Sequence, residues 1–98
     1  MNPLYQLSED NNLDDEQIII FTKRQGKHMN TYILNLPIEN MQPMLKQMKM
    51  KFGCGGSIDT ILYDNVERKA LHLQGNKIDS VDKYLRQNNI TNIFIKLN

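Results

Sequence analysis

The sequence predicts an α+β fold, a two-layer sandwich with two helices packed on one face of a mixed, mainly antiparallel five-stranded sheet. Five short stretches are rich in β-branched and aromatic residues, and two longer stretches repeat apolar residues at helical spacing. Glycine, proline or asparagine separates these stretches, which follow the order β-β-α-β-β-α-β. Because two helices cannot cover both faces of such a sheet, the other face is expected to be solvated or to bind a partner.

The first two strands are expected to form a hairpin. Residues 17–23 (QIIIFTK) have the composition of a buried strand, and residues 29–36 (MNTYILNL) resume it. The break between them, residues 24–28, contains Gly26, which readily adopts the positive φ that a tight turn requires. A helix is then expected over residues 41–52.

This helix has Asn40 as its expected N-cap, which places Pro43 in the first turn, where a missing N–H costs no intrahelical hydrogen bond. The glycine-rich residues 53–56 are expected to end it, with one of their glycines in a left-handed conformation. One face is apolar and consists of Met41, Met44, Leu45, Met48 and Phe52. Three lysines lie off that face: Lys46, Lys49 and Lys51.

The second half repeats the pattern of hairpin and helix. Strands are expected over residues 57–63 and 68–74, joined by a turn at residues 64–67. A second helix, opened by an asparagine, is expected over residues 76–88, and a last strand over residues 91–97.

The charge is distributed unevenly along the chain. Residues 1–17 carry five acidic and no basic residues, whereas residues 18–98 carry all 12 Lys and Arg against six acidic residues, a net charge of +6. We expect a flexible acidic tail over residues 1–16 and a folded domain over residues 17–98. A basic domain favours a polyanionic partner, although an ordinary soluble surface accounts for this charge equally well.

Composition excludes several classes of protein. No apolar stretch approaches the ~20 residues of a spanning helix, and the first residues lack the basic and apolar regions of a secretory signal. The single cysteine cannot form an internal disulfide or supply a Cys-rich zinc site. We expect a cytoplasmic monomer with no membrane partner, no metal and no cofactor.

Catalysis is not expected. Cys54 is a candidate nucleophile with His28 or His72 as its base, but the C-terminal end of a helix disfavours a thiolate, so a structural role is expected. His72 is expected to be solvated on the open face of the sheet. The glycine-rich residues 53–56 follow a helix and enter a strand, the reverse of the order in a phosphate-binding loop.

Nucleic-acid binding has more support. A cluster of cations lies within six residues at the expected hairpin tip: Lys23, Arg24, Lys27 and His28. Such a tip projects beyond the sheet and can reach phosphates in a groove, while Lys46 and Lys49 of the first helix could extend the same basic surface. A merely solvated tip is the alternative. Because no aromatic stacking signature is present, a platform for single-stranded bases is not expected.

Three segments resemble the translation initiation factor 1 family of eukaryotes and archaea. They are Lys51-Phe52-Gly53-Cys54-Gly55-Gly56-Ser57, Leu73-Gln74-Gly75-Asn76 and the basic Arg24-Gln25-Gly26-Lys27. The similarity covers about residues 17–97, in the family's order and spacing. It departs from the family at Gln25, where Asn is common, at Asn76, where Asp is usual, and at Met50, where eukaryotic members often have a cation.

The resemblance implies a non-enzymatic factor that binds RNA of the small ribosomal subunit near the P site, close to initiator tRNA and mRNA. It implies support of scanning and accurate AUG selection, release on start-codon recognition, and contacts with other initiation factors through the acidic tail. The positions that match the family's RNA-binding residues are Lys23, Arg24, Gln25, Gly26, Lys27, His28, Lys46 and Lys49. The turn that faces initiator tRNA in the family corresponds to Asp64, Asn65, Val66 and Glu67.

The acidic residues of that turn would repel tRNA phosphates, which offers a physical basis for displacement once the tRNA settles. The alternative is a non-enzymatic protein-interaction module of the same fold, acting in recycling or re-initiation through the open sheet face and the acidic tail.

Overall fold

The structure, a computed structural model, describes residues 17–97, so the tail predicted over residues 1–16 lies outside the described residues. The elements are β1 (Ile18–Gln25), β2 (His28–Leu34), α2 (Ile38–Phe52), β3 (Gly56–Tyr63), β4 (Val66–Gln74), α3 (Ile78–Gln87) and β5 (Ile93–Lys96). This order confirms the predicted β-β-α-β-β-α-β arrangement.

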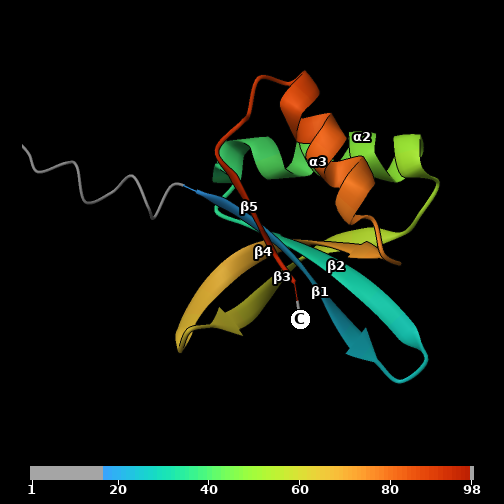
Figure 1. The fold of residues 1–98 in the computed structure, drawn as a ribbon, viewed down its shortest axis with the longest axis vertical. Coiled ribbons are helices and arrows are strands. Elements are labelled where there is room, and N and C mark those ends of the chain that lie inside the picture. The colour runs from blue at the N-terminus through green and yellow to red at the C-terminus, as the bar shows by residue number, and fades with distance from the viewer. Residues whose placement is uncertain (1–16, 98) are drawn as a thin grey trace, which may run out of the picture.

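The five strands form one mixed sheet with the order β3-β4-β2-β1-β5. The β1–β2, β2–β4 and β3–β4 pairs are antiparallel, whereas the short β5 runs parallel to β1 at one edge. Figure 1 shows α2 and α3 together on one side of the sheet, with the two hairpins diverging on the other side. The predicted α+β sandwich is therefore confirmed.

The main core lies between the two helices and the sheet. Alternate residues of the central strands face the helices, and Ile20, Ile33 and Leu71 are fully buried there. From α2 the predicted apolar face supplies Met41 and Met48, again with almost no exposure. Burial of apolar side chains is the main stabilising term for such a layer, at about 25 cal/mol per Å² of apolar surface.

The sheet is strongly curved, and its open face is concave. Tyr63 ends the edge strand β3, yet its ring centroid lies 5.6 Å from that of Phe21 on β1, with β4 and β2 between the two strands in the sheet order. In a flat sheet, three strand spacings would separate β3 from β1 by about 14 Å. The end of β3 therefore bends toward β1 across the open face, opposite the helices.

Both hairpin turns are tighter than predicted. The first turn contains only Gly26 and Lys27, and the second only Asp64 and Asn65, because the strands continue further than their composition indicates. Gly26 has φ +62°, whereas Asp64 and Asn65 have φ values of 52° and 66°, the pattern of a type I′ turn.

The helices differ from the prediction at their starts. α2 begins at Ile38 after Pro37, not at Met41 after Asn40, so Pro43 lies inside the helix. The carbonyl that a residue-43 N–H would have bonded belongs to the exposed Glu39, where water can replace the missing donor. α3 begins at Ile78. Asn76, the asparagine expected to open it, lies two residues earlier, and its Oδ1 accepts a hydrogen bond from the Ile78 N–H at 3.4 Å.

The helix ends agree with the prediction to within one residue, since α2 ends at Phe52 and α3 at Gln87. Gly53 has φ +62° and its backbone N–H bonds the Lys49 carbonyl, as expected of a left-handed C-cap. Asn89 after α3 also has a positive φ of 65°.

No helix within residues 17–97 is long and apolar enough to cross a membrane.

Candidate nucleic-acid interface

The first hairpin projects beyond the rest of the sheet. β2 pairs with β4 only from Asn30 onward, and β1 pairs with β5 only up to Phe21. The last two rungs of the hairpin, Arg24 with Met29 and Gln25 with His28, therefore lie beyond the ends of β4 and β5, although the Gly75 N–H after β4 still donates to the Met29 carbonyl at 2.7 Å. This end of the hairpin can enter a groove that the two-layer body cannot.

The predicted tip residues lie together at this end, but most of them belong to strands. Lys23, Arg24 and Gln25 end β1, and His28 begins β2, so only Gly26 and Lys27 form the loop. All six residues are exposed. The loop region predicted over residues 24–28 is thus a two-residue turn on a rigid ladder, which fixes the positions of its cations more firmly than a longer loop would.

The cations of the tip are not neutralised by carboxylates within the described chain. The two ion pairs found in residues 17–97 join His72 to Asp59 and Arg86 to Asp82, both away from the tip. At the base of the tip, Asn30 Nδ2 donates a hydrogen bond to Gln25 Oε1 at 3.0 Å, and neither group is charged. Lys23, Arg24 and Lys27 therefore keep their charge available for an external anion.

The lysines predicted on the first helix also point to solvent. Lys46, Lys49 and Lys51 are exposed on α2, opposite the buried face formed by Met41, Leu45 and Met48. Met50 is 71% exposed, so the residue standing at a position where eukaryotic members often have a cation takes no part in the core.

The second turn lies at the opposite end of the sheet from the cationic tip. Asn30 near the first turn pairs with Gln74 at the end of β4, and Leu34 pairs with Ala70. The start of β4 at Val66, and with it the second turn, therefore lies at the far end from the first turn. Asp64 and Asn65 form this turn, whereas Val66 and Glu67, predicted as turn residues, begin β4. All four are exposed, so the two projecting ends carry opposite charge.

The glycine-rich segment after α2 is explained by packing. Gly53 caps the helix, and Gly56 passes so close to β4 that a side chain would not fit. Cys54 is half-buried against the main core, as the predicted structural role requires. Gly53 and Gly56 therefore serve the fold.

His72 is not the solvated histidine that the sequence predicts. It does lie on the open face, but its side chain is only 18% exposed, because its ring stacks on Tyr32 with centroids 4.8 Å apart. Its Nδ1 lies 3.0 Å from Asp59 Oδ2, and Ser57 Oγ donates to the same carboxylate at 2.8 Å.

These three residue types also occur in hydrolase triads, but the geometry differs. In a triad the serine hydroxyl bonds one imidazole nitrogen and the carboxylate bonds the other. Here Ser57 and Asp59 both face Nδ1, while Nε2 is buried with no hydrogen-bond partner in residues 17–97. The arrangement cannot pass a proton from Ser57 through His72, so the cluster is structural.

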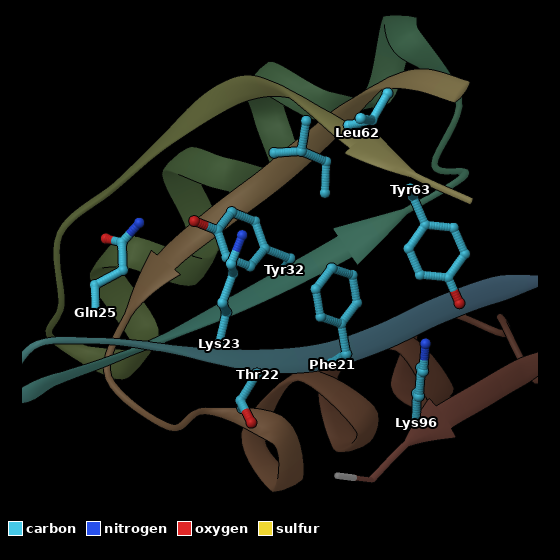
Figure 2. Close-up of a pocket in the computed structure, with 9 residues that line it drawn as sticks. Phe21, Thr22, Lys23, Gln25, Tyr32, Leu62, Tyr63 and Lys96 are labelled. Atoms are coloured by element: carbon cyan, nitrogen blue, oxygen red, sulfur yellow. The ribbon is translucent and has the colours of Figure 1, made fainter. Parts of the chain in front are cut away.

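The open face carries a row of aromatic rings that the sequence reading missed. Phe21 stacks on Tyr32 with centroids 5.4 Å apart and an interplanar angle of 22°, and Tyr63 lies on its other side. Figure 2 shows the Phe21 ring standing between Tyr32 and Tyr63. Lys96 Nζ lies 5.1 Å from the centroid of the Tyr63 ring, within the range of a cation–π contact.

The row borders a groove of about 470 Å³ on the concave face, which we call the open-face groove. It is lined by Phe21, Thr22, Lys23, Gln25, Tyr32, Ile61, Leu62, Tyr63 and Lys96. The rings pack against one another, so their faces are largely occupied, and the groove offers ring edges and lysines. The expectation that the sequence holds no aromatic cluster was therefore wrong.

Burial changes the ionisation of two tyrosines. Desolvation raises the pKa of Tyr32 above its ordinary value, and the negative charge of Asp59 raises it further. Desolvation likewise raises the pKa of Tyr84, whose hydroxyl donates to Gln47 in the helix layer.

Within residues 17–97, no group of three or more His, Cys, Asp or Glu residues could hold a metal ion.

Comparison with known protein families identifies the family of this chain. A protein-family model described as translation initiation factor SUI1 matches residues 15–91, which is well over half of the chain. Among curated proteins no match is found.

Proposed function

The chain belongs to the translation initiation factor SUI1 family, and on that premise we propose that it binds the small ribosomal subunit near the P site and enforces AUG start codons. Membership confirms the resemblance read from the glycine motifs and the basic hairpin. The family comprises translation initiation factors and is not an enzyme family, and we propose a cytoplasmic site of action for this member.

The observation that carries the proposal is the opposite charge of the two projecting ends. Lys23, Arg24 and Lys27 stand unpaired by described carboxylates at one end, and Asp64 and Glu67 stand exposed at the other. The cationic end suits the phosphates of ribosomal RNA, because such contacts depend on charge and reach and not on base sequence.

The acidic end suits a surface that must yield to an incoming polyanion. We place it toward initiator tRNA, so that the tRNA approaches the acidic turn as it settles on a start codon. Repulsion between carboxylates and phosphates a few ångströms apart then favours dissociation of the factor. The factor would thus slow commitment at mismatched codons and leave after a correct pairing.

The exposed lysines of α2 support a broader RNA contact. Lys46 and Lys49 are three residues apart on one helical face, and we propose that they contact ribosomal RNA beside the hairpin. No carboxylate of the described chain lies within ion-pair distance of either one.

A start-codon reporter tests the proposal most directly. Two reporters that differ only in AUG or UUG would be translated in a system where this protein is the only factor of its kind. We expect the protein to raise the AUG-to-UUG ratio, and reversal of Lys23, Arg24 and Lys27 to Glu to abolish that effect. A ratio that is independent of the protein would refute the proposed role.

The second candidate is a protein-interaction module in recycling or re-initiation. It is favoured by the apolar side chains exposed on the open face and its margins, such as Phe94 at 47% and Val66 at 50% exposure. Co-sedimentation with isolated small subunits separates the candidates. A subunit-binding factor pellets without other proteins, whereas an adaptor pellets only with its protein partner.

A further inference from the structure

The concave face of the sheet is apolar at its floor, although neither α2 nor α3 covers it. Tyr32, Leu34 and Ala70 are buried there and form a second cluster, separate from the main core. Phe21 and Tyr63 pack against this cluster but stay half-buried. An apolar surface of this kind, open to solvent in residues 17–97, is suited to a further segment of chain.

The same face has an excess of positive charge. The strand registers place three cations on it. Lys23 lies two residues after Phe21, and Lys96 pairs with Phe21. Arg68 pairs with Ile61, which lies two residues before Tyr63 on the same face. Among the strand residues on this face, Asp59 is the single carboxylate, and it is engaged by His72 and Ser57. The face therefore offers three cations and almost no competing anion.

Two of these cations are held over the ring of Tyr63. Lys96 Nζ lies 5.1 Å and Arg68 Cζ 5.8 Å from the ring centroid. Arg68 donates one hydrogen bond, to Asn35 Oδ1 at 3.0 Å, and its Nε–H has no partner within the described chain. The exposed Lys96 keeps its hydrogen-bonding capacity for a carboxylate, whereas Arg68 Nε is buried and Arg68 contributes positive charge to the face.

The segment that precedes β1 has the complementary composition. Residues 1–16 carry five carboxylates and no Lys or Arg, interspersed with Leu4, Tyr5, Leu7 and Leu13. The segment joins β1 next to the face in question, since Phe21 on the groove floor follows Ile18 by three residues, about 10 Å of strand. A turn near residue 16 would bring Leu13 and its acidic neighbours to the groove.

We propose that residues 1–16 fold back onto the open-face groove of the same chain, with carboxylates beside Lys23 and Lys96 and apolar side chains against Phe21 and Tyr63. A tether this short gives the segment an effective concentration in the millimolar range, so weak individual contacts suffice. Docking would lower the positive potential around the neighbouring hairpin tip, and a polyanion that engages the tip would compete with the docked segment.

One other site for the segment and one other occupant for the groove are less suitable. A cavity of about 670 Å³ lies close to Ile18, but no charged side chain lines it, so it offers the carboxylates nothing. Single-stranded RNA would match the lysines of the groove, yet the faces of the aromatic rings are used against one another and leave little for a base to stack on. The acidic segment of the chain itself is therefore the better occupant.

A spin label in the segment provides the test on the full chain. Cys54 is the only cysteine in the sequence, so Cys54→Ser combined with Ser8→Cys gives one attachment site for a nitroxide. Amide spectra first establish that this variant keeps the fold. We expect the label to remove most of the amide signal at Phe21, Lys23 and Lys96 while the signals of α2 and α3 persist.

Matched charge variants make the result specific. Reversal of Lys23 and Lys96 to Glu should restore the groove signals. Reversal of Lys69 and Lys83 to Glu changes the net charge equally but alters exposed positions off this face, and it should leave the loss unchanged. Equal recovery in both variants would mean diffuse attraction and would overturn the proposal.

Three further outcomes would also overturn it. Signal loss centred on the cavity near Ile18 and Ile90 would place the segment elsewhere. Loss in a mixture of labelled chains without isotope and isotope-enriched chains without label would identify a second copy as the occupant. An unaltered spectrum in the first experiment would show that the segment does not dock.

Discussion

Gly56 crosses β4 so closely that a methyl group on its Cα would lie 2.6 Å from the carbonyl oxygen of His72. The same methyl would meet Leu73 Cδ2 at 3.0 Å and Leu45 Cδ1 at 3.1 Å, so two layers of the fold would have to move. We expect Gly56→Ala to lower the free energy of unfolding by about 1–3 kcal/mol, the usual cost of overpacking.

Gly55→Ala is the matched control for this change. Its methyl would lie 2.8 Å from Gln74 Oε1, the far end of a flexible and exposed side chain that can rotate away. Urea unfolding of both variants should therefore show a clear loss for Gly56→Ala and a smaller one for Gly55→Ala. The reverse order would contradict the close packing of β3 on β4.

Thr31 joins the first hairpin to the start of α3. Its buried hydroxyl donates to the Gly75 carbonyl at 2.7 Å and accepts from the Lys77 N–H at 2.9 Å. Thr31→Val keeps the shape but leaves two backbone groups without this partner, so we expect a loss of about 1–3 kcal/mol in the free energy of unfolding. Thr31→Ser keeps the hydroxyl and should lose less, which thermal or urea unfolding would measure.

Lys27 should contribute to RNA binding through charge alone. We expect Lys27→Gln to weaken binding to small-subunit RNA and to reduce the slope of log K against log salt by about 1, as removal of one phosphate contact does. Lys69→Gln, which removes an exposed cation far from the tip, is the control and should leave the slope unchanged. Equal slopes for all three proteins would remove the tip from the interface.

The acidic turn should govern release of the factor. Asp64→Asn combined with Glu67→Gln removes two negative charges, and Asn tolerates the left-handed backbone observed at position 64. We expect slower dissociation from small subunits that carry initiator tRNA on an AUG message, because repulsion of the tRNA is reduced. The dissociation rate of a fluorescently labelled factor measures this, and an unchanged rate would separate the turn from release.

Alkaline pH should destabilise the fold through its tyrosines. Burial raises the pKa of Tyr32 in the folded state, so folding favours the neutral phenol. This contribution is complete below the unfolded-state value of about 10.0 and is lost as the pH rises through the higher folded-state pKa. In urea unfolding, Tyr32→Phe should show a shallower decline of stability above that pH, and an identical decline would contradict the assignment.

Local patterns were sufficient to predict the elements and most of the core. The spacing of Met41, Leu45 and Met48 identified the buried face of α2, and the left-handed conformation that ends this helix followed from the glycines after it. The cationic tip was predictable for the same reason, since its members lie within six residues of one another.

The features that escaped prediction depend on contacts distant in sequence. The aromatic row draws on three strands, and only the pairing registers and the curvature of the sheet bring Phe21 close to Tyr63. Pro43 was expected in a first turn because Asn40 is a good cap, but the chain turns into the helix directly after Pro37. Strand lengths were underestimated at both turns because polar residues such as Arg24 and Glu67 can still pair in a ladder.

The two-residue turns, Gly26-Lys27 and Asp64-Asn65, contribute no side chain to either apolar cluster and stand at opposite ends of the sheet. Each arm can therefore change its reach without disturbing the interior. Two extra residues per strand would extend one arm by about 7 Å and leave the span of the other as it was. Variants of this fold could therefore contact partners at different spacings while the core of the domain stays unchanged.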